Sequence, residues 1–258
     1  KKFKIITALS VFYDAESPKE FLSDVKKLLL PDGIFLLEFA DLASILKFKM
    51  FDTICHEHLE YYSTNVIINL TKQIGLRVFD IKQNDINGGS KQYFICHQNS
   101  HIKSNMKVIE KVIKDEIKLK LNKIETFKKF FKEINNLKFA LKKFLNSKSN
   151  QNKIIHCYGA STKGNTILQF LEINKNIIPY AIERNKEKIG AKTIGSNIEI
   201  ISENKAKLYF PDYKLVLPWH FKTEIIKREI DYLKKNGKLI FPLPNILIID
   251  KKNYSQYV

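Results

Sequence analysis

The chain has 258 residues, 44% of them hydrophobic and 12% aromatic, which is enough apolar material for two packed domains. The formal net charge of +17 would ordinarily suggest nucleic-acid binding, but Lys supplies nearly all of the excess, and Arg occurs only at Arg77, Arg184 and Arg228. Because base recognition relies on Arg, we expect no nucleic-acid partner. No segment approaches the roughly 20 apolar residues of a membrane span, so no membrane partner is expected. Three scattered cysteines favour a reducing, cytoplasmic location.

The first elements alternate between strand and helix. Residues 3–12 are predicted to form a buried strand that enters a loop. Ser17 is a suitable N-cap and Pro18 a suitable first-turn residue for a helix that ends at Pro31-Asp32-Gly33. Residues 34–39 form the next strand. This order is typical of the second half of a parallel nucleotide-binding sheet.

Residues 51–63 contain the densest group of titratable side chains in the chain. His56 and His58 flank Glu57, and histidine beside a carboxylate is suited to removing a proton near neutral pH. Two alternatives stay open for these residues. One is a structural, hydrogen-bonded histidine. The other is a metal site with Cys55 and more distant Cys and His residues, although the usual paired spacing of zinc ligands is missing.

The middle of the chain is predicted to contain a hairpin followed by helices. A helix over 65–74, a strand over 75–81, an Asn- and Gly-rich turn over 84–90 and a strand over 92–96 make up the first part. The turn is either only a turn or a substrate contact. Apolar residues then recur at helical spacing over residues 105–149, with breaks expected at Leu121-Asn122 and Asn135-Asn136, and a polar linker follows.

A second α/β region is predicted beyond residue 150. The expected elements are strands over 153–158, 177–182, 213–218 and 238–241, a helix starting at Asn165 and another over 222–235. The loop from Gly159 to Gly164 could present backbone amides to a phosphate. It is not a Walker A loop, because Asn165 follows Gly164 where that motif needs Lys. A loop with no ligand is the alternative.

Three sequence blocks carry a resemblance to a known family. They are Phe51-Asp52-Thr53-Ile54-Cys55-His56-Glu57-His58 with Tyr61-Tyr62-Ser63, then Asn87-Gly88-Gly89-Ser90, then Tyr158-Gly159-Ala160-Ser161-Thr162-Lys163-Gly164-Asn165-Thr166. In order and spacing they resemble the S-adenosylmethionine-dependent sugar C-methyltransferases. The resemblance implies an α/β fold in three parts: the later part of a class I methyltransferase Rossmann-like sheet over 1–99, a helical connector over 100–150, and a Rossmann-like α/β domain over 151–258.

The resemblance also implies an activity and residue roles. The substrate would be a nucleotide-linked 4-keto deoxysugar, methylated on the carbon beside the ketone. His58 would be the base, Glu57 would orient or polarise it, and His56 would complete the motif. Tyr13 stands where many relatives have His, Cys55 where they often have Tyr, and Gln92 where many have Arg. The substrate contacts that it implies are Cys55, Asn87, Gly88, Ser90, Gly159, Ser161, Lys163 and Asn165.

The cofactor implied by the resemblance is S-adenosylmethionine. A Gly-rich turn for its methionine end and an acidic residue for its ribose are missing from residues 1–83. We therefore expect a truncated chain that binds this cofactor weakly or not at all, with no metal of its own and any structural zinc in an upstream module. The alternative function is a nucleotide-sugar-binding module without activity. The oligomeric state is not predicted.

Overall fold

The computed structural model of the protein describes residues 1–258, apart from the side chain of Asn150. The chain divides into two compact units. The amino-terminal unit comprises residues 1–48 and 56–130, and the carboxy-terminal unit comprises residues 49–55 and 131–258. The division at residue 130 falls inside a continuous helix, α5 (Ile124–Asn150). The domain limits expected from the sequence, at residues 99 and 150, therefore stay a prediction.

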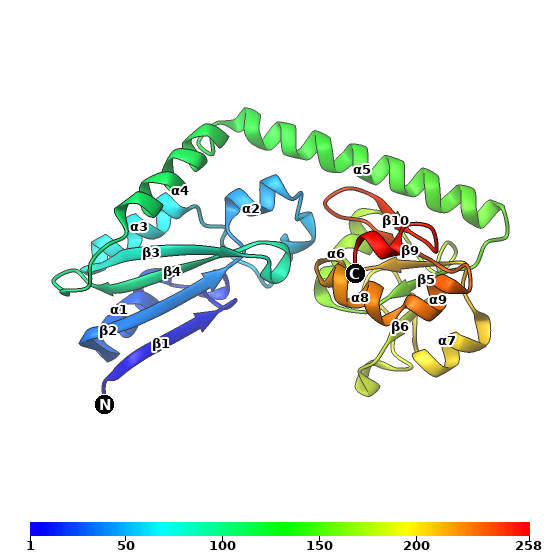
Figure 1. Ribbon diagram of the computed structural model, residues 1–258, viewed down its shortest axis with the longest axis horizontal. Helices are drawn as coiled ribbons and strands as arrows, with labels where there is room; N and C mark the ends of the chain where they lie inside the picture. Colours follow the sequence, from blue (N-terminus) through cyan, green and yellow to red (C-terminus); the bar gives the residue numbers. More distant parts are fainter. The chain divides into compact units, whose positions relative to one another are not determined.

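The amino-terminal unit is an α/β unit with a mixed sheet (Figure 1). Its principal elements are β1 (Phe3–Leu9), α1 (Pro18–Leu28), β2 (Leu29–Phe39), α2 (Leu42–Lys47), α3 (Thr64–Ile74), β3 (Leu76–Asn84), β4 (Ser90–His97) and α4 (Met106–Leu119). The strands lie in the order β1-β2-β4-β3, with β1 parallel to β2 and β4 antiparallel to both of its neighbours. The predicted strands, helices and hairpin are all present, but the predicted end of the first helix is wrong: α1 ends at Leu28, and Pro31-Asp32-Gly33 lies within β2.

Local sequence signals account for the first of these elements. The Ser17 hydroxyl accepts a hydrogen bond from the Glu20 amide at 3.4 Å, and Pro18 occupies the first turn of α1. The prediction that the first strand is buried is wrong. β1 is the edge strand of the sheet, and the side chains of Ile5 and Leu9 are 67% and 51% exposed.

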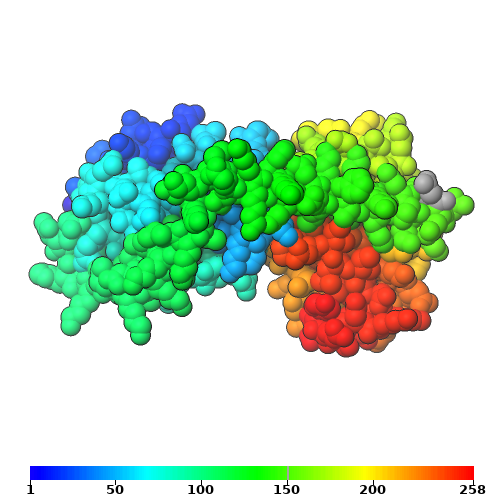
Figure 2. All heavy atoms as spheres, turned by 90° about the horizontal axis from the view of Figure 1, so that it is seen from above, coloured from blue at the N-terminus to red at the C-terminus, as the bar shows by residue number. Residues whose placement is uncertain are grey.

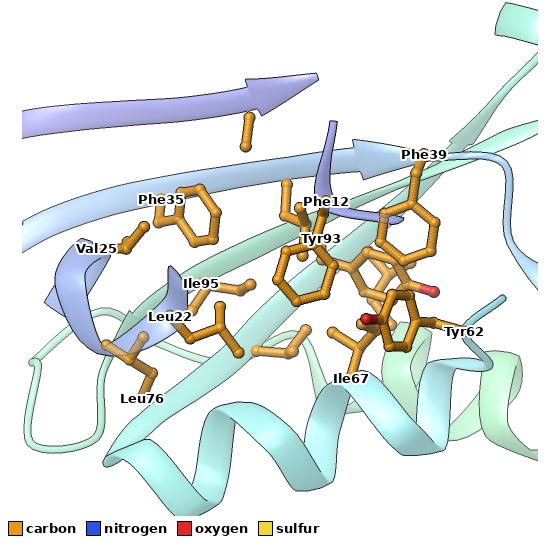
Figure 3. Close-up of a cluster of buried hydrophobic side chains, with 14 of the residues drawn as sticks. Phe12, Leu22, Val25, Phe35, Phe39, Tyr62, Ile67, Leu76, Tyr93 and Ile95 are labelled. Carbon is orange, nitrogen blue, oxygen red and sulfur yellow. The ribbon is translucent and has the colours of Figure 1, made fainter. Parts of the chain in front are cut away.

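One hydrophobic cluster joins α1, α3 and α4 to the sheet. Its end nearest the loop after β1 is aromatic. The ring of Phe12 lies 5.0 Å from that of Tyr62, and the ring of Phe39 stacks on that of Tyr93 at 5.5 Å (Figure 3). Aromatic pairs at these spacings stabilise a core beyond the area that they bury. This packing holds the loop after β1, which contains Phe12, next to Tyr62, which directly follows residues 56–61.

The carboxy-terminal unit is built on a larger sheet. Its elements are β5 (Ile155–Tyr158), α6 (Thr162–Phe170), β6 (Tyr180–Glu183), β7 (Glu199–Ser202), α7 (Glu203–Tyr209), β8 (Tyr213–Val216), α8 (Lys222–Arg228), α9 (Ile230–Lys234), β9 (Lys238–Phe241) and β10 (Leu247–Ile249). The strands lie in the order β10-β9-β8-β5-β6-β7, and only β10 is antiparallel to its neighbour. The sheet is therefore largely parallel.

Three predictions for this unit need correction. β7 and β10 were not predicted, since runs of three or four residues carry too little periodicity to be recognised. The helix expected over 222–235 is interrupted at Glu229 and forms α8 and α9. Finally, α6 starts at Thr162 rather than at Asn165, because the Ser161 hydroxyl caps it by accepting the Gly164 amide at 3.1 Å.

The helical region that lies between β4 and β5 in the sequence is interrupted once. Lys120 has a left-handed backbone at the end of α4, close to the predicted break at Leu121-Asn122, whereas Asn135 and Asn136 lie inside α5. The second half of α5 lies on the surface of the carboxy-terminal unit (Figure 2). There Lys138 and Lys142 form ion pairs with Glu172. No helix in the described part of the chain is long and apolar enough to cross a membrane.

Two histidines of the carboxy-terminal unit predict a loss of stability in acid. Burial lowers the pKa of His156 to about 4, assisted by the charge of Lys214, and burial with the charge of Lys163 does the same for His220. An unfolded histidine binds a proton near pH 6.5, so the unfolded state gains protons first as the pH falls. We expect His156 to cost about 2 kcal/mol of unfolding free energy between about pH 7 and pH 5.

Urea unfolding of the native chain and of His156→Phe at several pH values measures this effect. Phe should pack as His156 does, edge-on against the stacked rings of Tyr180 and Tyr209. Above pH 5, the unfolding free energy of His156→Phe should depend less on pH than that of the native chain. An equal dependence of unfolding free energy on pH in the two proteins would contradict the assignment.

Candidate active site

The proton-transfer residues predicted from the sequence meet beside the loop that follows β1. The rings of His58 and Tyr13 have centroids 4.1 Å apart, at an interplanar angle of 47°. The carbonyl oxygen of Tyr13 accepts hydrogen bonds from the amides of Leu59 at 2.9 Å and Glu60 at 3.2 Å. The segment after His58 is thus bound to the loop after β1 through the backbone. His58 is half-buried, so one part of its ring is packed and another reaches solvent.

Asp14 is a member of this group that sequence reasoning missed. Partial burial raises its pKa, the charge of His58 lowers it, and the charge of Glu57 raises it. Asp14 is therefore within electrostatic range of both residues. A carboxylate close to imidazole stabilises the protonated ring. The available signal was its place next to Tyr13 in the loop after a strand.

The other two residues of the His-Glu-His motif face solvent. His56 and Glu57 are exposed, and Cys55 is half-buried. The described residues contain no group of three or more His, Cys, Asp or Glu side chains placed to hold a metal ion. The arrangement of Tyr13, Asp14, Glu57 and His58 is suited to moving a proton.

The turn between β3 and β4 brings Asn87 to the same loop. Asn87 donates from Nδ2 to the Ser10 hydroxyl at 3.0 Å, and Ser10 directly follows β1. Asn87 has a φ of 57° and Gly88 a φ of 95°, values that Asn and Gly adopt most readily. The Ser90 hydroxyl is buried and donates to the Ile86 carbonyl at 2.9 Å. The structure thus brings Asn87 toward the loop and uses the Ser90 side chain inside the turn.

Gln92, which stands where many relatives carry Arg, has a partner within the sheet. Its side-chain amide donates to Glu38 Oε2 at 2.5 Å, and Asn84 donates to the same oxygen at 2.9 Å. Glu38 is only 3% exposed. A neutral amide therefore satisfies a buried carboxylate here, and the side chain of Gln92 is committed to that contact.

The second group of predicted site residues lies at the carboxyl ends of β5 and β6. Gly159 follows β5 with a φ of 86°, and a side chain there would come within 2.9 Å of Pro218. Its amide donates to the Ile182 carbonyl. Gly159 and Ser161 both line a cavity of about 350 Å³. Asn165 lies in the first turn of α6, and its side-chain oxygen is buried without a hydrogen-bond partner among the described residues.

Two arginines that the sequence analysis did not assign to a site line the same cavity. They are Arg184, just after β6, and Arg228, at the end of α8, where it pairs with Glu203. Arg is the side chain best suited to binding phosphate through two parallel hydrogen bonds. The signal in the sequence was the rarity of Arg, because the chain has 44 basic residues and only three arginines. Two of these three line the cavity.

Glu183 lines the cavity and binds the backbone around it. Its carboxylate accepts hydrogen bonds from the amides of Ala160 at 2.9 Å, Arg184 at 2.7 Å and Asn185 at 3.1 Å. Burial alone would raise its pKa, but these hydrogen bonds outweigh burial and lower it. Glu183 therefore stays ionised. The Ala160 amide lies in the loop that the sequence indicated as a possible phosphate site. In the structure this amide donates to Glu183.

The fold and these residues define a class of protein: a two-unit α/β protein with a histidine–carboxylate–tyrosine group in one unit and an arginine-lined cavity at the strand ends of the other. Residues 85–244 match the family described as the C-methyltransferase C-terminal domain. The chain belongs to this C-methyltransferase family, as the sequence resemblance indicated. It is 30% identical over 234 residues to the C-methyltransferase NovU of Streptomyces niveus. That match covers 91% of this chain and 56% of NovU, so the chain spans little more than half the length of this relative.

Proposed function

We propose that the chain takes part in methylation of a nucleotide-linked 4-keto deoxysugar, at the carbon next to the ketone. The observation that carries this proposal is the packing of His58 against Tyr13, with Asp14 within electrostatic range of both His58 and Glu57. A carbon beside a ketone becomes nucleophilic only after it loses a proton, so the reaction needs a base near neutral pH. Family membership supports methyl transfer to carbon.

In the proposed mechanism a ring nitrogen of His58 takes the proton from that carbon. The electron pair of the broken C–H bond passes into the enolate of the ketone. Asp14 and Glu57 stabilise the imidazolium that forms, because negative charge nearby favours the protonated ring. The Tyr13 hydroxyl is the proposed donor to the enolate oxygen. His58 then returns its proton to solvent.

S-adenosylmethionine, when bound, supplies the methyl group as an electrophile. The described residues after β1 and β2 include no glycine at either strand end, where a cofactor-binding turn would be expected. We therefore assign no cofactor-binding residue in this chain, and none of the steps above passes through the cofactor.

The carboxy-terminal unit is the proposed holder of the nucleotide part. Numbered from β5, its strands lie in the order 3-2-1-4-5-6, which is typical of Rossmann-like sheets. Such sheets bind ligands where the strand order reverses, here between β5 and β8. The cavity walls include Gly159 after β5 and Pro218 after β8, which supports a Rossmann-like nucleotide site. Arg184 and Arg228 are suited to its phosphates.

The first turn of α6 gives a prediction for nucleotide binding. Replacing Lys163 with Ala should weaken the affinity for the nucleotide sugar about tenfold, because a charged donor to phosphate contributes on the order of 1.5 kcal/mol. Calorimetry with the nucleoside diphosphate measures this. Lys175→Ala, an exposed lysine beyond the other end of α6, is the matched control and should bind normally. Equal affinities for both variants would remove Lys163 from the site.

A methyl-transfer assay tests the function itself. The protein from the complete reading frame is incubated with methyl-labelled S-adenosylmethionine and a nucleotide-linked 4-keto deoxysugar, and the product is analysed by NMR. Label on the carbon beside the ketone is expected. Tight binding of the nucleotide sugar with no transfer would support the alternative, a binding module without activity.

A further inference from the structure

A second cavity of the carboxy-terminal unit adjoins the arginine-lined one. Its volume is about 590 Å³, which is within the range of sites for small organic molecules. The two cavities share four lining residues and therefore meet at these side chains, which are Tyr158, Ile182, Glu203 and Arg228. Most of the remaining wall of the second cavity comes from α7, α9 and the residues that lead into β8.

Tyr158 carries a buried hydroxyl at this junction. The residue ends β5 and is 8% exposed, and its Oη has no hydrogen-bond partner among the described residues. Burial and then the charge of Glu229 raise its pKa to about 12, while Arg228 acts in the opposite direction. Glu203 and Arg184 also act on it. A buried hydroxyl without a partner costs free energy, and a ligand oxygen beside it would recover that cost.

The other end of the second cavity has an aromatic wall. Phe210 precedes β8 whereas Tyr158 ends β5, and these strands are parallel, so the cavity runs along them. The Phe210 ring lies 5.6 Å from that of Tyr232, at an interplanar angle of 52°. Tyr232 is buried and fixed, because its hydroxyl donates to the Pro211 carbonyl at 3.0 Å. Phe210 is 44% exposed, so its ring has surface left for a further contact.

The backbone of Phe210 is strained. At the end of α7 this residue has a φ of 35° and a ψ of 75°, in the left-handed region. Gly or Asn would end a helix in this conformation more easily than a bulky side chain. Strain of this kind gathers at ligand-binding sites, where the surrounding structure maintains it. The end of the helix alone therefore does not account for an aromatic residue here.

A nearly buried ion pair lies between the two ends of the second cavity. Lys214 Nζ is 2.5 Å from Glu229 Oε2, and both residues line the cavity. The same ammonium lies 4.0 Å from the centroid of the Tyr232 ring. The pair presents a hydrogen-bond donor beside an acceptor. The pairing edge of a nucleobase likewise has donors and acceptors side by side, and bases also stack on aromatic rings.

We propose that the second cavity binds the nucleoside of the nucleotide-linked sugar, with the base against Phe210 and the Tyr158 hydroxyl donating to a diphosphate oxygen where the cavities meet. This inference rests on the proposed function, in which Arg184 and Arg228 hold the phosphates. It adds a place for the base, which distinguishes a nucleotide from phosphate alone. Arg228 is already paired with Glu203, so a neutral donor at the same point adds to phosphate binding.

Calorimetry tests this nucleoside site without any assay of methyl transfer. The ligands are uridine diphosphate, adenosine diphosphate and inorganic pyrophosphate. The native chain should bind at least one of the two nucleotides about tenfold more tightly than pyrophosphate, because a stacked base adds affinity. The nucleotide that does so identifies the base as a pyrimidine or a purine.

Phe210→Ala should weaken binding of that nucleotide about tenfold and leave the affinity for pyrophosphate unchanged. Unchanged pyrophosphate binding also shows that the variant is folded. Phe210→Leu keeps an apolar side chain, removes the ring, and should repeat the loss even if Phe210→Ala folds poorly. Leu208→Ala, at an exposed position of α7 that lines neither cavity, is the control and should bind all three ligands as the native chain does.

Tyr158→Phe separates ligand binding from a structural role. The hydroxyl has no hydrogen bond to lose among the described residues, so the melting temperature without ligand should stay native or rise. The affinities for the nucleotide and for pyrophosphate should both fall about tenfold. A hydroxyl with only a structural role would give the reverse, a lower melting temperature with native affinities.

Native affinity for the nucleotide in both Phe210 variants, or in Tyr158→Phe, would overturn the proposal. So would equal affinities of the native chain for pyrophosphate and both nucleotides. The proposed function is tested apart from this, by methyl transfer. If the native protein transfers the methyl group but the Phe210 variants bind as it does, the nucleoside site fails and the function stands. Binding that depends on Phe210, with no methyl transfer, would support the nucleoside site and refute the function.

Discussion

Replacing His58 with Asn should lower turnover by roughly a hundredfold or more, the usual scale for loss of a general base. Asn is polar and of similar length, so it should keep much of the contact with the Tyr13 ring, 4.1 Å from the His58 ring in the native protein. The affinity for the nucleotide sugar should change little, because the proposed nucleotide cavity belongs to the carboxy-terminal unit. Steady-state kinetics and a thermal melt measure the two effects.

If His58 has only a structural role, the opposite result is expected. A half-buried, hydrogen-bonded histidine would leave turnover per folded molecule nearly unchanged after substitution and lower the melting temperature. His101→Asn, at an exposed position, controls for the substitution itself. His56→Asn should have a much smaller effect than His58→Asn, since His56 is exposed. A larger loss at His56 would transfer the role of the base to that residue.

Replacing Lys91 with Met should destabilise the protein by about 3 to 5 kcal/mol, the range for removing one partner of a buried ion pair. Lys91 is 5% exposed, and its ammonium lies 2.8 Å from both Asp41 and Glu116, which are themselves buried. It also donates to the Thr64 hydroxyl at 3.0 Å. Without the ammonium, two carboxylates would remain buried close together.

The pKa of Lys91 is consistent with this role. Burial alone would lower it, but the charges and hydrogen bonds of Asp41 and Glu116 outweigh burial and raise it. A raised pKa adds stability that is present at neutral pH and is lost as the pH rises through the folded-state value. Urea unfolding of Lys91→Met measures the effect. Lys118→Met removes a partner of the exposed Asp115 and should leave stability nearly unchanged. A loss below about 1 kcal/mol for Lys91→Met would show that the network is dispensable.

Local sequence signals predicted much of the fold. Ser17 and Pro18 set the start of α1, and the Asn- and Gly-rich turn at residues 84–90 indicated the β3–β4 hairpin. Periodicity does not say which strand lies at an edge, so β1 was expected to be buried and is exposed. The short strands β7 and β10 owe their place to pairing with β6 and β9. Such pairing is invisible in a run of three or four residues.

The site was predictable where neighbours in sequence are neighbours in space. Glu57 and His58 were found from their spacing. Asp14 was missed because its proximity to them depends on the return of the chain to the loop after β1. Tyr158 and Phe210 are distant in the sequence, and their place on one cavity follows from tertiary packing alone. The two arginines of the cavity were visible as rare residues but could not be placed together without the sheet.

Proton exchange at the substrate carbon tests the central claim most directly. The protein from the complete reading frame is incubated with the nucleotide-linked 4-keto deoxysugar in heavy water, with no S-adenosylmethionine, and the carbon beside the ketone is followed by NMR. We predict that the native protein introduces deuterium there and that His58→Asn, though folded, does so at least about a hundredfold more slowly. Exchange at equal rates in the two proteins, or none in the native protein, would contradict the account.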